Sequence, residues 1–246
     1  MTKFSEIQSS TYSADARRDF GWSRRGFLRS SVAGVAAGMM TGAGAELAMA
    51  PSARAQTTLS PEAALHEMME GNRRFVEGRM TSFNDDLKML KAKTAEKQQP
   101  FAALLSCADS RVPVELIFDQ TIGHLFVTRV AGNVASSEII ASLEYGVAVL
   151  GTKAIVVLGH ANCGAVKASI EAKAVPGQIS ALYRYIRPAV DQAGKDLDAA
   201  IKANAKIQAA LLRESSPVIA DGIKKKQLTV VAAVYDLASG KVTQVD

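Results

Sequence analysis

The sequence is poor in the residues that build disulfide frameworks and multi-ligand structural metal sites. Among its 246 residues there are two cysteines and three histidines. Two cysteines are too few for a disulfide-rich scaffold or for a structural zinc site with four cysteine ligands. With 48% hydrophobic and 22% charged residues, the chain is not intrinsically disordered. We expect one globular domain.

Strongly apolar runs long enough to cross a membrane are also missing. The most apolar stretch near the N-terminus, from Val32 to about Ala45, is rich in Ala and Gly. It falls short of the ~20 strongly apolar residues that a spanning helix needs. A membrane anchor and an amphipathic organellar presequence are therefore the weaker readings of this segment, and we expect no stable anchor.

Residues 1–55 are better interpreted as an export leader. The twin-arginine stretch SRRGFLR, residues 23–29, precedes the apolar run, and the small-residue pattern ARA, residues 53–55, follows it. This order is that of a secretory signal, and the paired arginines Arg24 and Arg25 resemble the twin-arginine (Tat) type. We predict handling by the Tat export machinery, a periplasmic or secreted location, and a domain formed by residues 56–246.

The chain lacks a strong excess of positive charge once the leader is set aside. Its formal net charge is +5, but residues 1–55 carry seven Lys/Arg and four Asp/Glu. The rest keeps 22 basic and 20 acidic residues, a net charge of +2. Nothing in this balance indicates nucleic-acid binding.

Apolar runs alternate with helical patterns through residues 56–246. Strands are expected at 101–106, 125–130, 154–159 and 228–235, with a short last strand after a turn at 236–240; helices are expected at 60–78, 136–149, 163–173, 180–192 and 197–213, with another possible at 84–99. Such alternation predicts an α/β fold with a mainly parallel sheet covered by helices on both faces. Ligands of such sheets bind outside the carboxyl ends of the strands.

Both cysteines lie at predicted strand ends. Cys107 follows the strand at 101–106 and opens the sequence CADSR, while His160 and Cys163 follow the strand at 154–159 in the sequence HANC. Two thiols and an imidazole at neighbouring strand ends make a three-ligand set for zinc with one open position, which is typical of catalytic zinc. A disulfide between the cysteines is the alternative.

An acidic and a basic residue accompany the first thiol. Asp109 can orient a zinc-bound water, or it can ligate zinc as a fourth ligand and close the site; Arg111 can pair with it bidentately and hold it away. Of the other histidines, His66 lies in the middle of a predicted helix and is expected to be a surface or a packing residue. His124 precedes a strand, where a proton-relay role is conceivable.

Around these residues the sequence resembles the β-class carbonic anhydrases, from about Leu59 to Val242. The similarity is carried by CADSR at 107–111, GHANCGA at 159–165, FDQ at 118–120, RVAGN at 129–133 and VYDLASGKV at 234–242.

The resemblance implies one zinc ion per subunit on Cys107, His160 and Cys163, with Asp109 and Arg111 as the catalytic pair. It implies reversible hydration of carbon dioxide to bicarbonate and a proton through zinc-bound hydroxide. It also implies that Gln120 and the backbone at Gly132 adjoin the substrate.

The same resemblance implies a subunit arrangement and leaves other functions open. It implies a homodimer or tetramer whose N-terminal helical arm, at 60–78, wraps a partner subunit. Two alternatives remain: hydrolysis of carbon disulfide or carbonyl sulfide on the same fold, and a non-catalytic zinc-binding protein. Residues Asp109 and Arg111 argue against the second, since storage needs neither.

Overall fold

The structure is a computed structural model that describes residues 57–82, 92 and 94–246. The predicted leader at 1–55 lies outside these residues, as does much of the predicted helix at 84–99. The boundary between leader and domain therefore stays a prediction. Within the described ranges, no helix has the length and apolarity to span a membrane.

A five-stranded sheet with the order β2-β1-β3-β4-β5 organises the described residues. Its strands are β1 (Ala102–Ser106), β2 (Leu125–Arg129), β3 (Ala154–His160), β4 (Thr229–Tyr235) and β5 (Val242–Gln244). The first four are mutually parallel, and β5 pairs antiparallel with β4. Every residue of β1 and β3 is buried, as expected for strands covered on both faces. The predicted mainly parallel α/β fold is confirmed.

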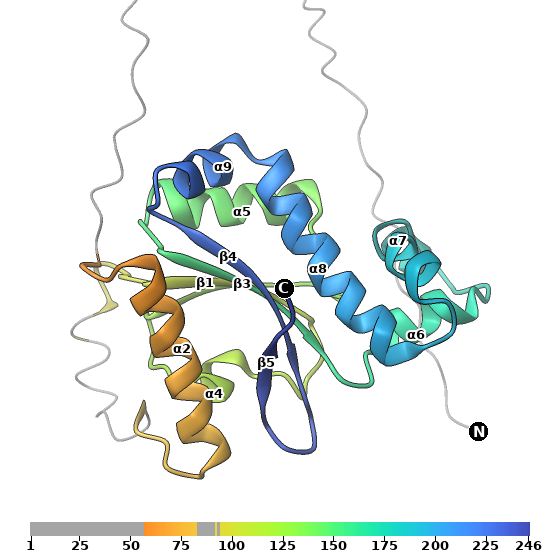
Figure 1. Ribbon diagram of the computed structural model, residues 1–246, viewed down its shortest axis with the longest axis horizontal. Coiled ribbons are helices and arrows are strands. Elements are labelled where there is room, and N and C mark those ends of the chain that lie inside the picture. The colour runs from red at the N-terminus through yellow and green to blue at the C-terminus, as the bar shows by residue number, and fades with distance from the viewer. Residues whose placement is uncertain (1–56, 83–91, 93) are drawn as a thin grey trace, which may run out of the picture. The chain divides into compact units, whose positions relative to one another are not determined.

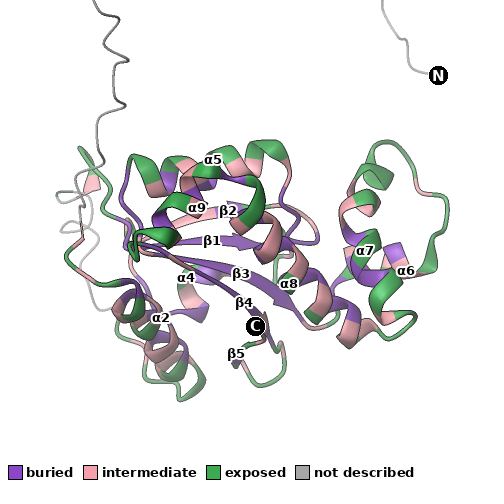
Figure 2. Ribbon diagram, turned by 45° about the horizontal axis from the view of Figure 1, so that its top comes forward, coloured by how far each residue is buried: buried purple, intermediate pink, exposed green. Residues whose placement is uncertain are grey.

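Helices cover both faces of this sheet (Figures 1 and 2). The helices α2 (Pro61–Val76) and α4 (Val114–Ile117) lie on one face; α5 (Ser137–Ala148), α8 (Leu197–Ser215) and α9 (Pro217–Lys224) lie on the other. Because neighbouring strand residues point to opposite faces, Leu104 packs in the first layer and Leu105 in the second.

A third group of helices extends past the carboxyl ends of the strands (Figure 2). It comprises α6 (Gly164–Glu171), the 3₁₀ helix η2 (Ile179–Leu182) and α7 (Tyr183–Ala193). Ile186 of α7 and Ile201 of α8 form an apolar cluster with Cys107 and Cys163. Apolar side chains therefore cover the carboxyl ends of β1 and β3.

The first described helix begins where its sequence predicts. The Ser60 hydroxyl accepts a hydrogen bond from the Ala63 amide at 3.2 Å, and Pro61 occupies the first turn. Ala64 and Met68 are fully buried against the sheet of their own chain. The predicted arm is therefore an integral layer of this fold, and its contact with a partner stays a prediction.

Two helices, α4 and α9, were not predicted. The four residues of α4 are too few for a periodic pattern. By contrast, α9 begins at Pro217 and is capped by Ser216, whose hydroxyl accepts from the Ile219 amide at 3.1 Å. This repeats the Ser-Pro start at residues 60–61, so the signal was present in the sequence.

Candidate metal centre

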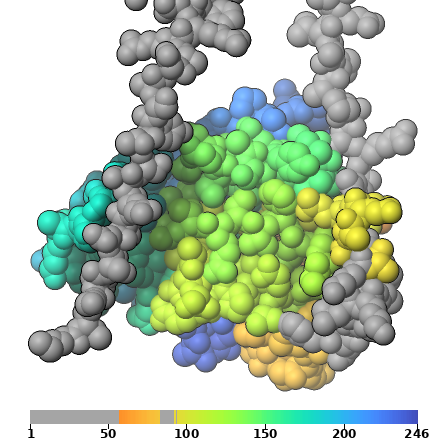
Figure 3. Space-filling model, turned by 180° about the vertical axis from the view of Figure 1, so that it is seen from behind, coloured from red at the N-terminus to blue at the C-terminus, as the bar shows by residue number. Residues whose placement is uncertain are grey.

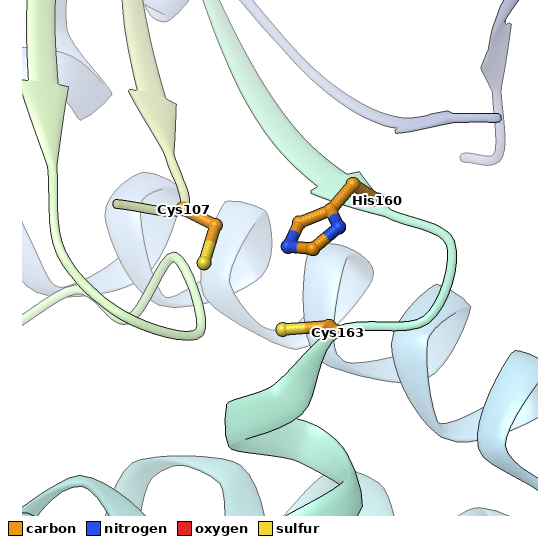
Figure 4. A group of neighbouring side chains, drawn as sticks. All are labelled: Cys107, His160 and Cys163. Carbon is orange, nitrogen blue, oxygen red and sulfur yellow. The ribbon is translucent and has the colours of Figure 1, made fainter. Parts of the chain in front are cut away.

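Cys107, His160 and Cys163 come together at the carboxyl ends of the central strands. Cys107 directly follows β1, His160 is the last residue of β3, and Cys163 is the residue before the first turn of α6. Their ligand atoms all lie within 4.8 Å of one another, and the side chains converge on one point (Figure 4). The register explains this, because β1 and β3 are adjacent and run in parallel.

The imidazole of His160 is prepared to accept a metal. Its Nδ1 lies 2.9 Å from the carbonyl oxygen of Ala161, which can only accept, so Nδ1 carries the proton. Nε2 is then a bare acceptor, and it is buried without a hydrogen-bond partner among the described residues. A buried polar atom left unpaired costs about 1–3 kcal/mol, and a metal ion removes that cost. Two sulfurs and this nitrogen fit zinc.

Both cysteines are buried free thiols, so the structure does not have the alternative disulfide. The pKa of Cys107 falls to about 4, chiefly because the Cys163 thiol donates to it, with help from the Gly132 amide. The pKa of Cys163 is raised, because its proton is held by Cys107 and its thiol is buried. One of the two sulfurs is thus ready as a thiolate ligand.

Gly132 brings its backbone to the site. Its amide donates to the Cys107 sulfur at 3.3 Å, and its φ of +78° is one that residues with a side chain rarely adopt. A Cβ there would lie 2.8 Å from Cδ1 of Ile186 and 3.3 Å from Cβ of Ala165. Glycine is therefore required for this approach. A contact of Gly132 with substrate stays a prediction.

Asp109 and Arg111 form the predicted pair beside the metal ligands. Arg111 donates from Nε to Oδ1 of Asp109 at 2.9 Å and from Nη2 to Oδ2 at 2.7 Å. The Arg111 guanidinium is the main cause that holds the pKa of Asp109 well below its usual range. Oδ2 of Asp109 lies 3.8 Å from Nε2 of His160. An ionised carboxylate, engaged by arginine, therefore stands next to the metal position.

Arg129 supports the same turn and was missed as a site residue. It donates from Nε to the Cys107 carbonyl at 3.0 Å and from Nη2 to the Asp109 carbonyl. Arg129 ends β2, opposite Ser106 in the β1 register. A cation at the end of a strand adjoining the first thiol was the signal that could have identified it.

The remaining candidates lie in another hydrogen-bonded group. Gln120 is buried and donates to the Phe118 carbonyl at 3.1 Å and to Glu67 at 3.4 Å, while its Oε1 lies 3.4 Å from Nδ1 of His124. None of these partners is a member of the three-ligand group. A substrate contact by Gln120 and a proton relay by His124 stay predictions. His66 is exposed on α2, as expected.

Taken together, these features define an α/β protein with a candidate catalytic metal centre at the carboxyl edge of its parallel sheet. The family model described as carbonic anhydrase matches residues 102–242. "Carbonic anhydrase 2" of Mycobacterium tuberculosis is 36% identical over 190 residues, covering 74% of this chain and 91% of the relative. A carbonic anhydrase of Mycolicibacterium smegmatis is 34% identical over 191 residues, covering 74% and 92%.

Solved structures agree with this assignment. The β-carbonic anhydrase CcaA superposes with a TM-score of 0.60 at 26% identity, covering 74% of this chain and 95% of that one. The Coccomyxa β-carbonic anhydrase, solved with acetazolamide, gives 0.59 at 28% identity, covering 74% and 86%. The chain belongs to the β-carbonic anhydrase family, the enzyme class predicted from its two cysteine motifs.

Proposed function

We propose that the protein hydrates carbon dioxide reversibly to bicarbonate and a proton, using one zinc ion held by Cys107, His160 and Cys163. The observation that carries the proposal is Nε2 of His160, which faces two thiols and is buried with no hydrogen-bond partner in the part of the chain that the structure describes. When bound, zinc acts as a Lewis acid that lowers the pKa of water at its open position toward about 7.

The chain's own residues orient the reaction. Since its pKa is held low, Asp109 is ionised at neutral pH and can only accept a hydrogen bond. It therefore accepts a hydrogen bond from the attacking water and turns the oxygen lone pair toward carbon dioxide. Arg111 restrains the carboxylate through two hydrogen bonds and keeps it from moving onto the metal position. Release of the Asp109 carboxylate from Arg111 would let Asp109 move onto the metal position and close the site.

The proposal is tested by stopped-flow carbon dioxide hydration with the zinc-replete full chain at about pH 8–9, above the expected pKa of the water. We expect turnover, and a loss of at least about 10²-fold in Asp109→Asn with zinc content retained. Asp221→Asn is the matched control, because Asp221 is an exposed carboxylate paired with Lys225 on α9. Hydrolysis of carbon disulfide or carbonyl sulfide without carbon dioxide hydration would replace the proposal.

We further propose a homodimer or a tetramer of such dimers, joined along the open edge of the sheet. In the described residues β2 pairs with β1 alone, and Ile122, Tyr145 and Val149 are 58%, 48% and 48% exposed around it. In Figure 3 the part of the chain around β2, coloured lime to green, forms the middle of the face that is shown. Light scattering of the full chain should give twice or four times the monomer mass; a monomer at micromolar concentration would contradict it.

For location, we propose twin-arginine export to the periplasm or outside the cell. The support is the SRRGFLR stretch with the apolar and small-residue segments after it. Replacing Arg24 and Arg25 by lysines should retain the protein in the cytoplasm, whereas Lys3→Arg in the same leader should not. Unchanged export of the double variant would refute the route.

A further inference from the structure

We infer that two buried amides of α8, Asn204 and Gln208, are positioning residues that hold the Gly132 amide on the Cys107 sulfur and thereby tune this metal ligand. The inference rests on the proposed zinc centre and adds a supporting layer to it. In the described part of the chain neither residue has a hydrogen bond to the three-ligand group, and neither was singled out by its sequence pattern.

Asn204 fixes the glycine. Its Nδ2 donates to the Gly132 carbonyl at 2.9 Å, while the Gly132 amide donates to Cys107 at 3.3 Å. Both bonds are made by Gly132, which has a φ of +78° and no side chain that could hold its backbone in place. The amide and the carbonyl lie in the two peptide planes that meet at the Gly132 Cα, so fixing the carbonyl reduces the freedom of the amide to turn away from the sulfur.

Gln208 orients Asn204 and ties down the other end of the segment. Its Nε2 donates to Oδ1 of Asn204 at 3.2 Å and to the Tyr185 carbonyl at 3.0 Å, and its Oε1 accepts from the Ala135 amide at 2.9 Å. This pattern also assigns both amide orientations, because each nitrogen faces an acceptor. The segment from Gly132 to Ala135 is thus held at both ends by one turn of α8.

Burying two side-chain amides on this helix face costs more free energy than a purely structural role would require. Asn204 and Gln208 are each 1% exposed, on a helix face whose other buried residues include Ile201 and Leu212. Buried amides are tolerated only when their hydrogen bonds are made, and here those bonds lead to the loop that contacts a metal ligand. An apolar residue would fill the helix face without that restraint.

An amide that donates to a thiolate withdraws electron density from the sulfur. Without the restraint, we expect the amide to be less well placed on the Cys107 sulfur and the position of this ligand to become less defined, so that the site binds zinc more weakly. Loss of such supporting hydrogen bonds typically weakens metal affinity about 10–100-fold.

The test compares two buried asparagines in the full chain. Asn204→Ala should raise the zinc dissociation constant about 10–100-fold in chelator competition, and should move the thiolate-to-metal absorption band of the cobalt-substituted protein to lower energy. Asn72→Ala is the matched control: Asn72 is 3% exposed, donates to the Ile117 and Gly240 carbonyls and accepts from the Val242 amide, but lies on α2. We expect its affinity and band to stay at wild-type values.

Gln208→Met, which keeps the volume, provides a second measurement should Asn204→Ala fail to fold. A smaller shift in the same direction would support the inference. Wild-type affinity and an unmoved band in the variants that fold would overturn it, as would an equal loss in Asn72→Ala. These outcomes leave the zinc centre standing, whereas a wild-type chain that takes up no stoichiometric zinc overturns both proposals.

Discussion

Gly132→Ala is the change whose consequences the structure defines most closely. The new methyl group would meet Cδ1 of Ile186 at 2.8 Å, on a backbone with a φ of +78°. It would therefore introduce a backbone penalty and a packing conflict at the residue whose amide contacts Cys107.

The two contributions can be estimated separately. A residue with a side chain in left-handed backbone costs about 1–2 kcal/mol. Overpacking of a core costs about 1–3 kcal/mol, and the lower end applies because the atom met is the last one of the Ile186 side chain. We expect Gly132→Ala to lower the free energy of unfolding by about 2–3 kcal/mol.

Ile186→Val separates the contributions, because it removes the Cδ1 atom in conflict. Alone it should cost about 0.5–1.5 kcal/mol. In the double variant the conflict is gone but the backbone penalty remains, so the loss should be about 1 kcal/mol smaller than the sum of the single variants. Urea unfolding of the four metal-free proteins measures this. Additivity within about 0.3 kcal/mol, or a Gly132→Ala cost well below 1 kcal/mol, would refute the reasoning.

Three further predictions follow from the site and its surroundings. Burial opposes ionisation of Asp119, but hydrogen bonds from Arg74 and two backbone amides outweigh it and lower its pKa to about 2. The resulting stability is complete above the unfolded pKa of about 3.9 and is lost as the pH falls through about 2. In urea unfolding, wild type should therefore lose about 2 kcal/mol more of its free energy of unfolding than Asp119→Asn over this window. Equal losses in the two proteins would contradict this role of Asp119. Arg129→Met should lower turnover and zinc affinity together, because the Cys107 and Asp109 carbonyls lose their donor; wild-type values for both would count against that role. Saturating zinc at about 100 times its dissociation constant should stabilise the chain by about 2.7 kcal/mol over a chelator-treated sample, and identical melting curves would disprove binding to the folded state.

Much of the metal centre was predictable because parallel strands bring their carboxyl ends to one edge. Cys107 and His160 each end an apolar run, so a parallel sheet places both at the same edge, and the strand order observed in the structure puts β1 beside β3. Asp109 and Arg111 followed from their spacing, and the structure pairs them.

Contacts made across the fold were not predictable in this way. The faces of α8 were judged by apolar periodicity, which does not register Asn204 and Gln208 as buried, although both are 1% exposed. Their partners lie in a loop some seventy residues earlier, and only tertiary packing brings the two together. The hydrogen bond from Gln120 to Glu67 likewise depends on α2, which no local pattern connects to Gln120.

The division of the ligands between β1 and β3 has a consequence for folding. His160 and Cys163 are neighbours in the chain, but Cys107 lies 53 positions before His160. An unfolded chain offers only the local pair, and the complete donor set exists once β1 and β3 have aligned in register. A bound ion would then act as a reversible cross-link between the two central strands, one that forms only on the native pairing and closes a long loop. Metal content would therefore report, molecule by molecule, whether the centre of the sheet has been assembled correctly.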